Sequence, residues 1–518
     1  MNTMNTLYYE WFENPLYWFQ HNKITDNYLC NKYLKQIEKT DKILEYKEIY
    51  SKETLISSVL LLDQIPRHYK RLGYDIDVDY YSEKACKFSN FILQIYRSLL
   101  TIDELCFICL PYRHLKDIDK IHEIIDKFII LYDKSNSKNK TKCRRFLNAT
   151  LNNIYKTISN NYVVNNLPVK SWFELNEDIF QVANKTNNYI DNVSNIIKSE
   201  FLKLPKDANI IVSLSGGVDS IVALDIISKL TKNVMAIHIN YNNRTESTDE
   251  LDFVNYYCNK LKVKLIYRTI TEIKRKSCLN NGLRDIYENV TKKIRMDMYS
   301  RFIDANTYIL LGHNKDDSFE NIITNIINKN NYSNLSGMEI LKNIDNINFW
   351  RPMLNINKKE IIEYANYNNI PYLFDSTPKW SIRGKIRDKL KPLICNLKNS
   401  ENNDIEAFFD LKNYIKETND IINNVVINNI YDKFQKENDI ITGIFSISDL
   451  YTFRYKSVVK ALFNKMNISV SNKTLGDFIE YINRFILTNK EKYFILNKNN
   501  NITIKNTDNN LYKKFIIM

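Results

Sequence analysis

The fold of the central part of this chain is decided by the stretch Ile210-Ile211-Val212-Ser213-Leu214-Ser215-Gly216-Gly217-Val218-Asp219-Ser220. Its apolar beginning predicts a buried strand, its paired glycines a tight turn, and its last three residues the start of a helix. Adjacent glycines allow backbone N–H groups to close around phosphate oxygens, and the positive end of the helix points at the same anion. The serine hydroxyls can donate to phosphate, and the aspartate can hold Mg²⁺. We therefore predict a phosphate-binding loop, although the GxxxxGK[ST] spacing is missing and no lysine follows the turn.

Glycine is scarce in this chain, which makes each glycine informative. The sequence has 9 glycines and 9 prolines in 518 residues, whereas average usage would give roughly 36 and roughly 26. Collagen-like, glycine-linker and proline-rich classes are thereby excluded. Each remaining glycine is expected where a side chain is not tolerated.

Size and charge bound the class of protein. With 518 residues and 44% hydrophobic composition, the chain can form roughly two to four domains. The net charge of +13, from 73 Lys and Arg against 60 Asp and Glu, favours a polyanionic partner such as RNA or DNA. Lysine enrichment through A/T-rich codons explains the excess about as well.

The sequence also bears on the compartment of the protein. No secretory signal is evident between Met1 and Trp18, and no run reaches about 18 apolar residues. We therefore expect a cytoplasmic protein that has no membrane span. The 8 cysteines are expected to be reduced and mostly buried, including the CxxC pair Cys106 and Cys109.

Hydropathy patterns divide the chain into three parts. Residues 1–165 show helical spacing and predict an all-α, repeat-like domain, in which the basic run 134–145 is a solvated connecting loop or an RNA contact. Residues 190–400 alternate apolar strands with helices and predict a doubly wound parallel α/β domain. Residues 401–518 predict a small mixed α/β region. The expected strands are 210–212, 234–237, 263–267 and 308–311 in the central part, and 493–496 and 502–504 near the end.

Two segments of the first part resemble a known family. They are Leu60-Leu61-Leu62-Asp63-Gln64-Ile65-Pro66-Arg67-His68 and Leu110-Pro111-Tyr112-Arg113-His114. They are similar to the LLLDQ-[FI]-PR signature of a helical family of unknown function, DUF924. The resemblance covers roughly residues 5–160 and implies an all-α domain without implying an activity. Asp63, Gln64 and Arg67 either pin helices together or line a polar site, and we favour the first interpretation.

The central part resembles the N-type ATP pyrophosphatases, which cleave ATP to AMP and pyrophosphate while adenylating a substrate. The segment Ser215–Ser220 matches their pyrophosphatase loop, SGGVDS. Further segments resemble, in order, the motifs of the tRNA(Ile)-lysidine synthetases within that group. They are His238–Arg244, Gly312–Asn321, Leu335–Met338, Arg351–Leu354, Asp375–Thr377 and Arg383–Arg387.

The resemblance implies a set of site residues together with ATP and Mg²⁺ as cofactors. The implied ATP-binding residues are Ser215, Gly216, Gly217, Val218, Asp219, Ser220, His238, Asn240, Gly312 and His313. The implied catalytic carboxylates are Asp219, Asp316, Asp317 and Glu320, of which Asp219 and Asp317 would hold Mg²⁺. The residues implied to contact tRNA or phosphate are Arg244, Arg383, Lys385 and Arg387.

Each of these roles has a plainer alternative. The carboxylates can cap a helix, the arginines can form surface ion pairs, and the histidines can be satisfied core residues. The sequence also departs from the family motifs, since Tyr241, Asn314, Ser318, Gly384 and Asp388 replace the usual residues. Because the loop itself is intact, the resemblance constrains ATP binding more tightly than it constrains specificity for lysine.

The implied activity is that of a tRNA-modifying ligase with tRNA and L-lysine as partners. ATP adenylates C2 of the wobble cytidine in tRNA(Ile), and the lysine ε-amine then displaces AMP to give lysidine. Residues 401–518 resemble the tRNA-binding region of these enzymes by pattern, and the oligomeric state is left open. One alternative is a tRNA thiolase, although Cys258, Cys278 and Cys395 form no CxxC pair. Another is a catalytically weakened adaptor that binds nucleotide or RNA.

Overall fold

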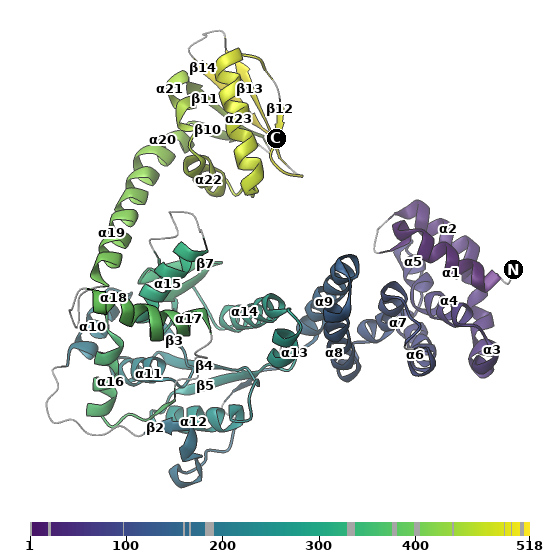
Figure 1. Ribbon diagram of the computed structural model, residues 1–518, viewed down its shortest axis with the longest axis horizontal. Coiled ribbons are helices and arrows are strands. Elements are labelled where there is room, and N and C mark those ends of the chain that lie inside the picture. Colours follow the sequence, from purple (N-terminus) through teal and green to yellow (C-terminus); the bar gives the residue numbers. More distant parts are fainter. Residues whose placement is uncertain are drawn as a thin grey trace.

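The structure is a computed structural model of the chain. It describes all residues except 1–2, 19–21, 97, 159–160, 165–166, 182–190, 329–336, 375–380, 398–404, 438–439, 492, 499 and 508–511. Three parts follow one another along the chain (Figure 1). Within the described residues, no helix is both long and apolar enough to cross a membrane.

The first part is built from helices alone. Its longer helices pack their apolar faces into one core, with α6 lying against both α4 and α7. The helices are α1 (Thr3–Glu13), α2 (Lys23–Tyr33), α3 (Thr40–Glu45), α4 (Lys52–Asp63), α5 (Ile65–Arg71), α6 (Val78–Ile95), α7 (Ile102–His114), α8 (Ile118–Lys134) and α9 (Ser137–Ile158).

The DUF924-like signature residues hold these helices together. Asp63 at the end of α4 is fully buried and accepts hydrogen bonds from Ser82 Oγ on α6 at 2.8 Å and from His114 Nδ1 on α7 at 2.9 Å. Arg67 on α5 donates to Ser82 Oγ at 2.9 Å. Burial alone would raise the pKa of Asp63, but His114 and Arg67 hold it below its ordinary value. The signature therefore forms a charged, hydrogen-bonded junction between helices, as our favoured interpretation expects.

The basic run 134–145 is not a loop, so that prediction was wrong. The connection between α8 and α9 is short, and α9 begins at Ser137. Cys143, Phe146 and Leu147 are buried, and the Phe146 ring stacks on Phe128 of α8 with centroids 4.3 Å apart. The polar run is thus the exposed side of an amphipathic helix, whose apolar side supplies the stability that a polar loop would lack.

The second part is organised around a seven-stranded sheet with the order β1-β5-β4-β3-β6-β8-β7. The five inner strands are parallel, and the two edge strands run antiparallel to their neighbours. The strands are β1 (Val163–Val164), β3 (Asn209–Ser213), β4 (Val234–Asn240), β5 (Lys264–Thr269), β6 (Thr307–Leu310), β7 (Leu341–Ile344) and β8 (Ile347–Trp350). The expected central strands are all present.

Helices cover both faces of this sheet, so the doubly wound α/β prediction is confirmed. Ile211 and Ile237 face a core that includes α14 and runs on into the first part, whereas Ile210 and Val212 face α10, α11, α12 and α16. The helices are α10 (Asn192–Phe201), α11 (Val218–Leu230), α12 (Ser247–Lys260), α13 (Arg275–Asn280), α14 (Arg284–Ser300), α15 (Lys315–Ile327), α16 (Lys358–Tyr367), α17 (Ile382–Lys385) and α18 (Lys391–Leu397). A small pair, β2 (Phe180–Gln181) and β9 (Tyr372–Leu373), lies beside the sheet.

The strand order reverses at β3, which positions the site. From β3 the chain goes first to β4 on one side and later to β6 on the other. The loops that leave β3 and β6 therefore diverge and open a crevice at the carboxyl ends of the strands. Both predicted site segments, the SGGVDS loop and the segment after β6, lie at this edge.

The third part begins with α19 (Glu406–Ile421), which leads away from the central sheet (Figure 1). A second sheet, antiparallel and five-stranded, follows in the order β10-β11-β14-β13-β12. Sequence patterns predicted the helices near 455–466 and 475–486 and the strand pieces that became β12 and β13, but not the other helices of this part or β10, β11 and β14. The elements are α20 (Asn428–Tyr431), β10 (Phe434–Glu437), β11 (Ile440–Ser446), α21 (Ile447–Thr452), α22 (Lys456–Lys465), α23 (Asn472–Thr488), β12 (Tyr493–Ile495), β13 (Asn501–Asn506) and β14 (Tyr512–Ile517).

Candidate active site

The loop between β3 and α11 requires a glycine at its turn. Gly216 has φ +87°, and a Cβ at this position would lie 2.3 Å from Cδ1 of Leu373 on β9. The Gly216 carbonyl also accepts a hydrogen bond from the Leu373 N–H at 2.9 Å. Gly217, the N-cap of α11, has an ordinary φ of −69°. The first glycine is thus dictated by packing, while the second leaves the helix N-terminus without a covering side chain.

The loop hydroxyls are arranged around this helix start. Ser220 Oγ donates to the Gly217 carbonyl at 3.0 Å and accepts from the Ser215 N–H at 3.2 Å. Ser215 Oγ lies 3.1 Å from Ser220 Oγ. Gly312, which follows β6, is so close that a Cβ there would lie 3.1 Å from the Ser220 backbone nitrogen. The two loops are therefore in contact, and this contact requires Gly312 to lack a side chain.

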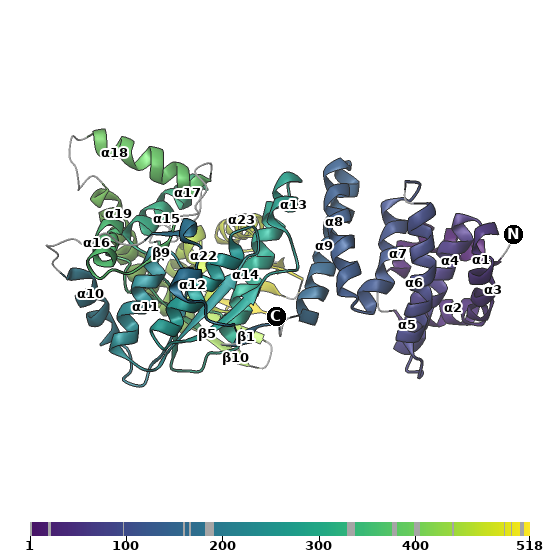
Figure 2. The ribbon, with the colours of Figure 1, turned by 90° about the horizontal axis from the view of Figure 1, so that it is seen from below.

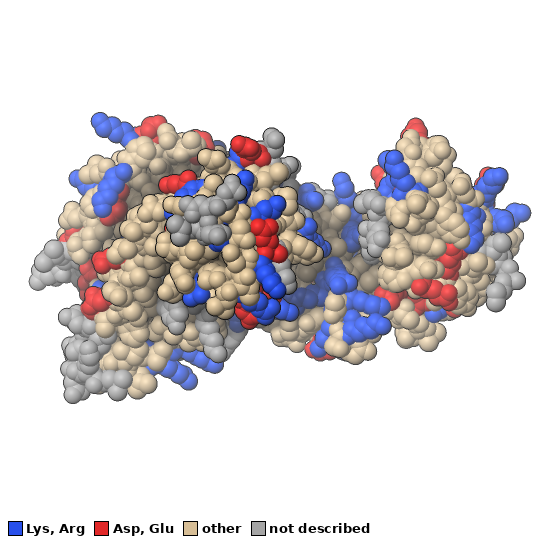
Figure 3. All heavy atoms as spheres, turned by 90° about the horizontal axis from the view of Figure 1, so that it is seen from above, with Lys and Arg blue, Asp and Glu red and all other residues tan. Residues whose placement is uncertain are grey.

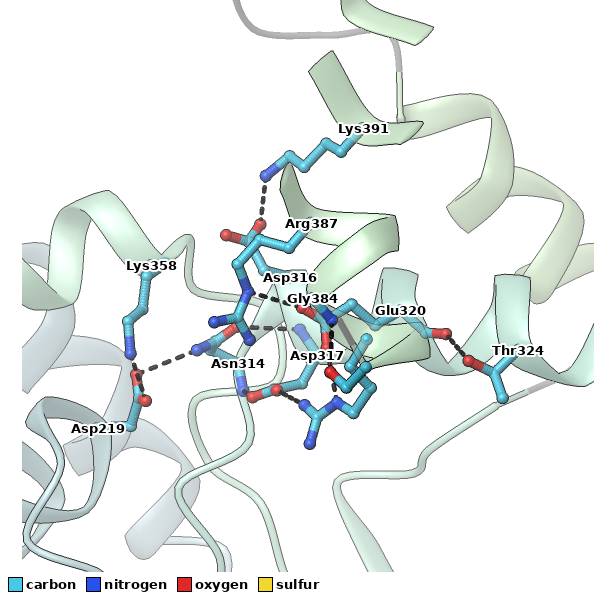
Figure 4. Close-up of polar contacts among 12 residues, drawn as sticks. Asp219, Asn314, Asp316, Asp317, Glu320, Thr324, Lys358, Gly384, Arg387 and Lys391 are labelled. Carbon is cyan, nitrogen blue, oxygen red and sulfur yellow. Dashed lines mark hydrogen bonds and ion pairs between the residues drawn. The ribbon is translucent and has the colours of Figure 1, made fainter. Parts of the chain in front are cut away.

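Asp219 lies in the first turn of α11 and faces the second loop. Lys358 Nζ on α16 contacts its Oδ2 at 2.5 Å, and Asn314 Nδ2 donates to its Oδ1 at 3.0 Å (Figure 4). Burial raises the pKa of Asp219, as does the nearby charge of Asp317, and Lys358 opposes both effects. Asp219 is thus a recessed carboxylate held by a lysine that comes from a distant segment of the chain.

The start of α15 brings the remaining carboxylates to the same place. Asn314 is the N-cap: its side chain accepts from the Asp317 N–H at 3.1 Å, and Asp317 Oδ2 accepts from the Asn314 N–H at 3.1 Å. Asp316 contacts Lys391 Nζ on α18 at 2.7 Å. Asn314 therefore joins Asp219 to Asp317, so the residue that departs from the family motif bridges the two loops.

Glu320, one turn further along α15, is buried between two arginines. Its Oε2 accepts from Arg383 Nε at 2.7 Å and its Oε1 from Arg387 Nε at 2.9 Å. Arg383 also pairs with Asp317. The two arginines are four residues apart, as expected, and Figure 4 shows Arg387 reaching into the carboxylate cluster. In this structure the plainer alternative, ion pairing, describes their contacts.

A cavity of about 200 Å³ opens beside this cluster. His313 at its edge accepts a hydrogen bond from Arg351 Nε at 3.3 Å, which places the imidazole proton on Nε2. Burial and the neighbouring Arg351 lower the pKa of His313 to about 4, against the opposing effect of Asp317, so the ring is neutral at physiological pH. The cavity lining comprises His313, Asp317, Glu320, Asn321, Thr324, Met338 and Arg383.

The residues predicted at the end of β4 brace the site. His238 is buried, its Nδ1–H donates to the Leu214 carbonyl at 2.8 Å, and burial lowers its pKa, so it is a neutral core residue. Asn240 is also buried and bonds to the backbone at Ser247 and Asn242. Arg244 pairs with Glu250 at 2.6 Å. These contacts hold the segment that follows β4 in place beside the SGGVDS loop.

Several other predicted residues have simple settings. Lys385 is exposed, Gly384 is buried and donates its N–H to Ser381 Oγ at 3.0 Å, and Asp388 is exposed. Tyr241 packs against the core that joins the helical part to the α14 side of the sheet. Asp375–Thr377 and the first two residues of Leu335–Met338 lie outside the described residues.

Sequence reasoning missed three lysines at the site. Lys358 holds Asp219, Lys391 holds Asp316, and Lys412 on α19 donates to Ser318 Oγ at 3.2 Å. Burial and the neighbouring Lys416 lower the pKa of Lys412. The N-x-x-E capping signal at Asn357 marks the helix start beside Lys358, but nothing in the spacing links it to Asp219, 139 residues away.

The donor set can be compared with the needs of Mg²⁺. Magnesium bound with a nucleotide usually takes one or two carboxylates, with phosphate oxygens and water completing its shell. Asp219 and Asp317, joined through Asn314, meet that requirement. The part of the chain that the structure describes has no group of three or more His, Cys, Asp or Glu side chains that could hold a metal. Nucleotide phosphates would therefore have to supply much of the coordination.

Comparisons with known proteins agree with this geometry. Residues 186–394 match the family model described as PP-loop domain, and residues 7–189 match the one described as bacterial protein of unknown function, DUF924. A tRNA(Ile)-lysidine synthase from Mycoplasma mycoides is 28% identical over 315 residues, 58% of this chain and 72% of that protein. The enzyme of that name from Francisella tularensis subsp. novicida is 24% identical over 293 residues, 54% of this chain and 71% of that protein.

Other matches cover less or are more distant. The tRNA(Ile)-lysidine synthase of Clostridioides difficile is 30% identical over 229 residues, 42% of this chain and 47% of its own length. Among solved structures, the U34-tRNA thiolase NcsA from Methanococcus maripaludis has 19% identity and a TM-score of 0.34, covering 44% of this chain and 82% of that one. The protein thus joins a helical DUF924 domain to a PP-loop domain and is an enzyme of the ATP-using PP-loop ligase type.

Proposed function

We propose that this enzyme is a tRNA(Ile)-lysidine synthase, which adenylates C2 of the wobble cytidine and joins L-lysine to it with release of AMP and pyrophosphate. The observation that carries the proposal is the contact between the SGGVDS loop and the carboxylate cluster at α15. This contact supports phosphate binding at the turn and binding of a small cationic amino acid in the cavity beside the carboxylate cluster. Curated relatives that bear this enzyme name support it.

In this proposal the loop and the start of α11 bind the phosphates of ATP. The N-terminus of α11, where the N-cap Gly217 supplies no side-chain hydrogen bond, and the helix dipole attract them. Asp219 and Asp317 would hold Mg²⁺, whose positive charge would stabilise the departing pyrophosphate. Lys358, which contacts Asp219, supplies a further positive charge beside the proposed phosphate site.

The cavity beside α15 would hold lysine. Asp317 and Glu320 supply negative charge for an amino group, and Thr324 and Met338 supply apolar surface for the methylene chain. Arg383, whose side chain is 53% exposed, can turn towards the α-carboxylate and thereby free carboxylate oxygens for the substrate. The neutral His313 adds no charge that would repel an ammonium group.

The test is incorporation of radiolabelled lysine into tRNA transcripts, measured together with pyrophosphate release. A transcript with a CAU anticodon should be labelled in the presence of ATP, and a matched transcript with U in place of the wobble cytidine should not. Equal labelling of the two transcripts would contradict wobble-cytidine specificity. ATP binding without incorporation into any transcript would favour the adaptor alternative and overturn the proposal.

A further inference from the structure

The charged surface where the helical part meets the α/β part is strongly one-sided. Helix α9 has 22 residues and no acidic side chain, and its basic residues are Lys138, Lys140, Lys142, Arg144, Arg145 and Lys156. Short α13 adds Arg275 and Lys276, again with no acid. In the space-filling view, lysine and arginine side chains gather where the helical part meets the α/β part (Figure 3).

Three contacts between the parts make this surface continuous. Arg144 on α9 pairs with Asp285 on α14. Lys293 on α14 donates to Asn152 Oδ1 on α9 at 3.0 Å, and its Nζ lies 4.5 Å from the centroid of the Tyr155 ring. Two views place α8 and α9 between the other helices of the first part and α13 and α14 (Figures 1 and 2). The helical part therefore packs against α14 through one side of α9, and the remaining basic residues of α9 face solvent.

Four of the acids near this surface are already neutralised. Asp103, Asp126, Asp285 and Glu288 each pair with a basic residue, leaving the exposed Lys138, Arg145, Lys276 and Lys292, for which no ion pair is found within the described residues. A solvated helix face usually mixes charges, because unlike pairs four residues apart stabilise it and like pairs destabilise it. On α9 Lys142 and Arg144 are balanced by Asp103 and Asp285, whereas Lys138 and Arg145 face solvent with no ion pair among the described residues. The helix thus carries uncompensated positive charge that a bound polyanion would neutralise.

The surface also leads towards the candidate active site. Tyr299 Oη on α14 lies 2.6 Å from Ser213 Oγ at the end of β3, the strand that leads into the SGGVDS loop. Helix α14 therefore extends from its contacts with α9 to the strand beside the candidate active site. An RNA lying along α9 and α14 would be guided to the carboxylate cluster.

We propose that α9, α13 and α14 form an RNA-binding surface, through which the fused helical domain holds the phosphate backbone of the tRNA substrate. The inference rests on the proposed function, because it takes tRNA as the substrate of the adjacent site. It gives the DUF924 domain a role in substrate binding. Binding of this kind is sequence-independent, weakens with salt, and loses about one unit of the slope of log affinity against log salt for each phosphate contact removed.

The test compares two quadruple variants with the same loss of charge. K138Q/R145Q/K276Q/K292Q removes the outward charges of the surface, and K35Q/K39Q/K42Q/K87Q removes four exposed lysines elsewhere on the helical part. Fluorescence anisotropy with a labelled tRNA transcript measures affinity at several salt concentrations. A third variant, K138R/R145K/K276R/K292R, keeps the charge, and thermal melting checks the folding of all three.

The surface variant should bind tRNA at least about tenfold more weakly at moderate salt, with a slope reduced by about 3 to 4. The control and the charge-preserving variant should bind within about twofold of the unmodified protein. Equal losses in the surface and control variants, or an unchanged slope in the surface variant, would overturn the inference. If the unmodified protein binds tRNA through this surface but incorporates no lysine, the proposed function fails while this inference stands.

Discussion

Replacing Gly216 by alanine is the sharpest perturbation that the loop offers, because its neighbour provides the control. At Gly216 an added methyl would lie 2.3 Å from Leu373 Cδ1 on a backbone with φ +87°. At Gly217 the φ is −69°, and the nearest atom to an added methyl is Ser215 Oγ at 3.6 Å. The two substitutions add the same atoms one residue apart in the same loop, so their difference isolates the local geometry.

The structure gives the expected magnitudes. A non-glycine residue at positive φ costs about 1–2 kcal/mol, and overpacking against a buried neighbour such as Leu373 costs about 1–3 kcal/mol. G216A should therefore destabilise the region around β3 and α11 by about 2–5 kcal/mol. G217A should cost only about 0.5–1 kcal/mol, the loss expected when alanine replaces glycine at an N-cap, since neither φ nor packing opposes the methyl group.

Hydrogen exchange followed by mass spectrometry measures this local effect in peptides that cover β3 and α11. Calorimetric titration with ATP supplies the functional readout, in which G217A should bind more weakly although it is stable, because its methyl intrudes on the phosphate site. The double variant G216A/L373A should recover part of the steric cost but not the backbone strain. Equal exchange in G216A and G217A would refute the reasoning, since it would mean that the turn relaxes around the methyl.

Three further predictions follow from the site. D219A should lower pyrophosphate release from ATP by at least about a hundredfold while leaving the far-ultraviolet circular dichroism unchanged; unaltered turnover would contradict the phosphate-loop assignment. The pKa of His313 is about 4 in the folded chain and 6.5 in the reference state, so acid favours the unfolded chain between these values. Urea unfolding should show full stability above pH 6.5 and a decline towards pH 4 that is shallower in H313Q. Ending the chain after Asp432 should weaken tRNA binding more than ATP binding, whereas equal losses would indicate a purely structural role for the third part.

The point of truncation illustrates what the structure changed. From sequence alone, a cut near residue 405 separates the third part cleanly. In the structure α19 packs on the candidate active site. The rings of Phe408 and Phe319 meet edge-on with centroids 5.2 Å apart, and Lys412 donates a hydrogen bond to Ser318. Removing α19 would disturb the carboxylate cluster directly, so a cut must leave this helix in place.

Local sequence determined the elements that carry the chemistry. The apolar run before Ser215, the paired glycines and the capping signals around Asn314 each specify a strand, a turn or a helix start through interactions within a few residues. The order of strands and helices also specified the doubly wound fold, because parallel strands need helical crossovers. The missed strand β10, with its mostly exposed residues, lacks this local signal, whereas β11 and β14 carry apolar residues whose strand pattern was overlooked.

What only the tertiary structure decided is which charges meet. Lys358 reaches Asp219, Arg383 reaches Glu320, and the basic run that begins near Lys138 becomes a helix docked on the central sheet. Neither ion pair has a signature in sequence spacing, since an ion pair depends on distance in space and on burial rather than on separation along the chain. The docking of the helix likewise depends on residues far away in the sequence. The sequence therefore specified a phosphate loop without a lysine, and the fold brought one to it.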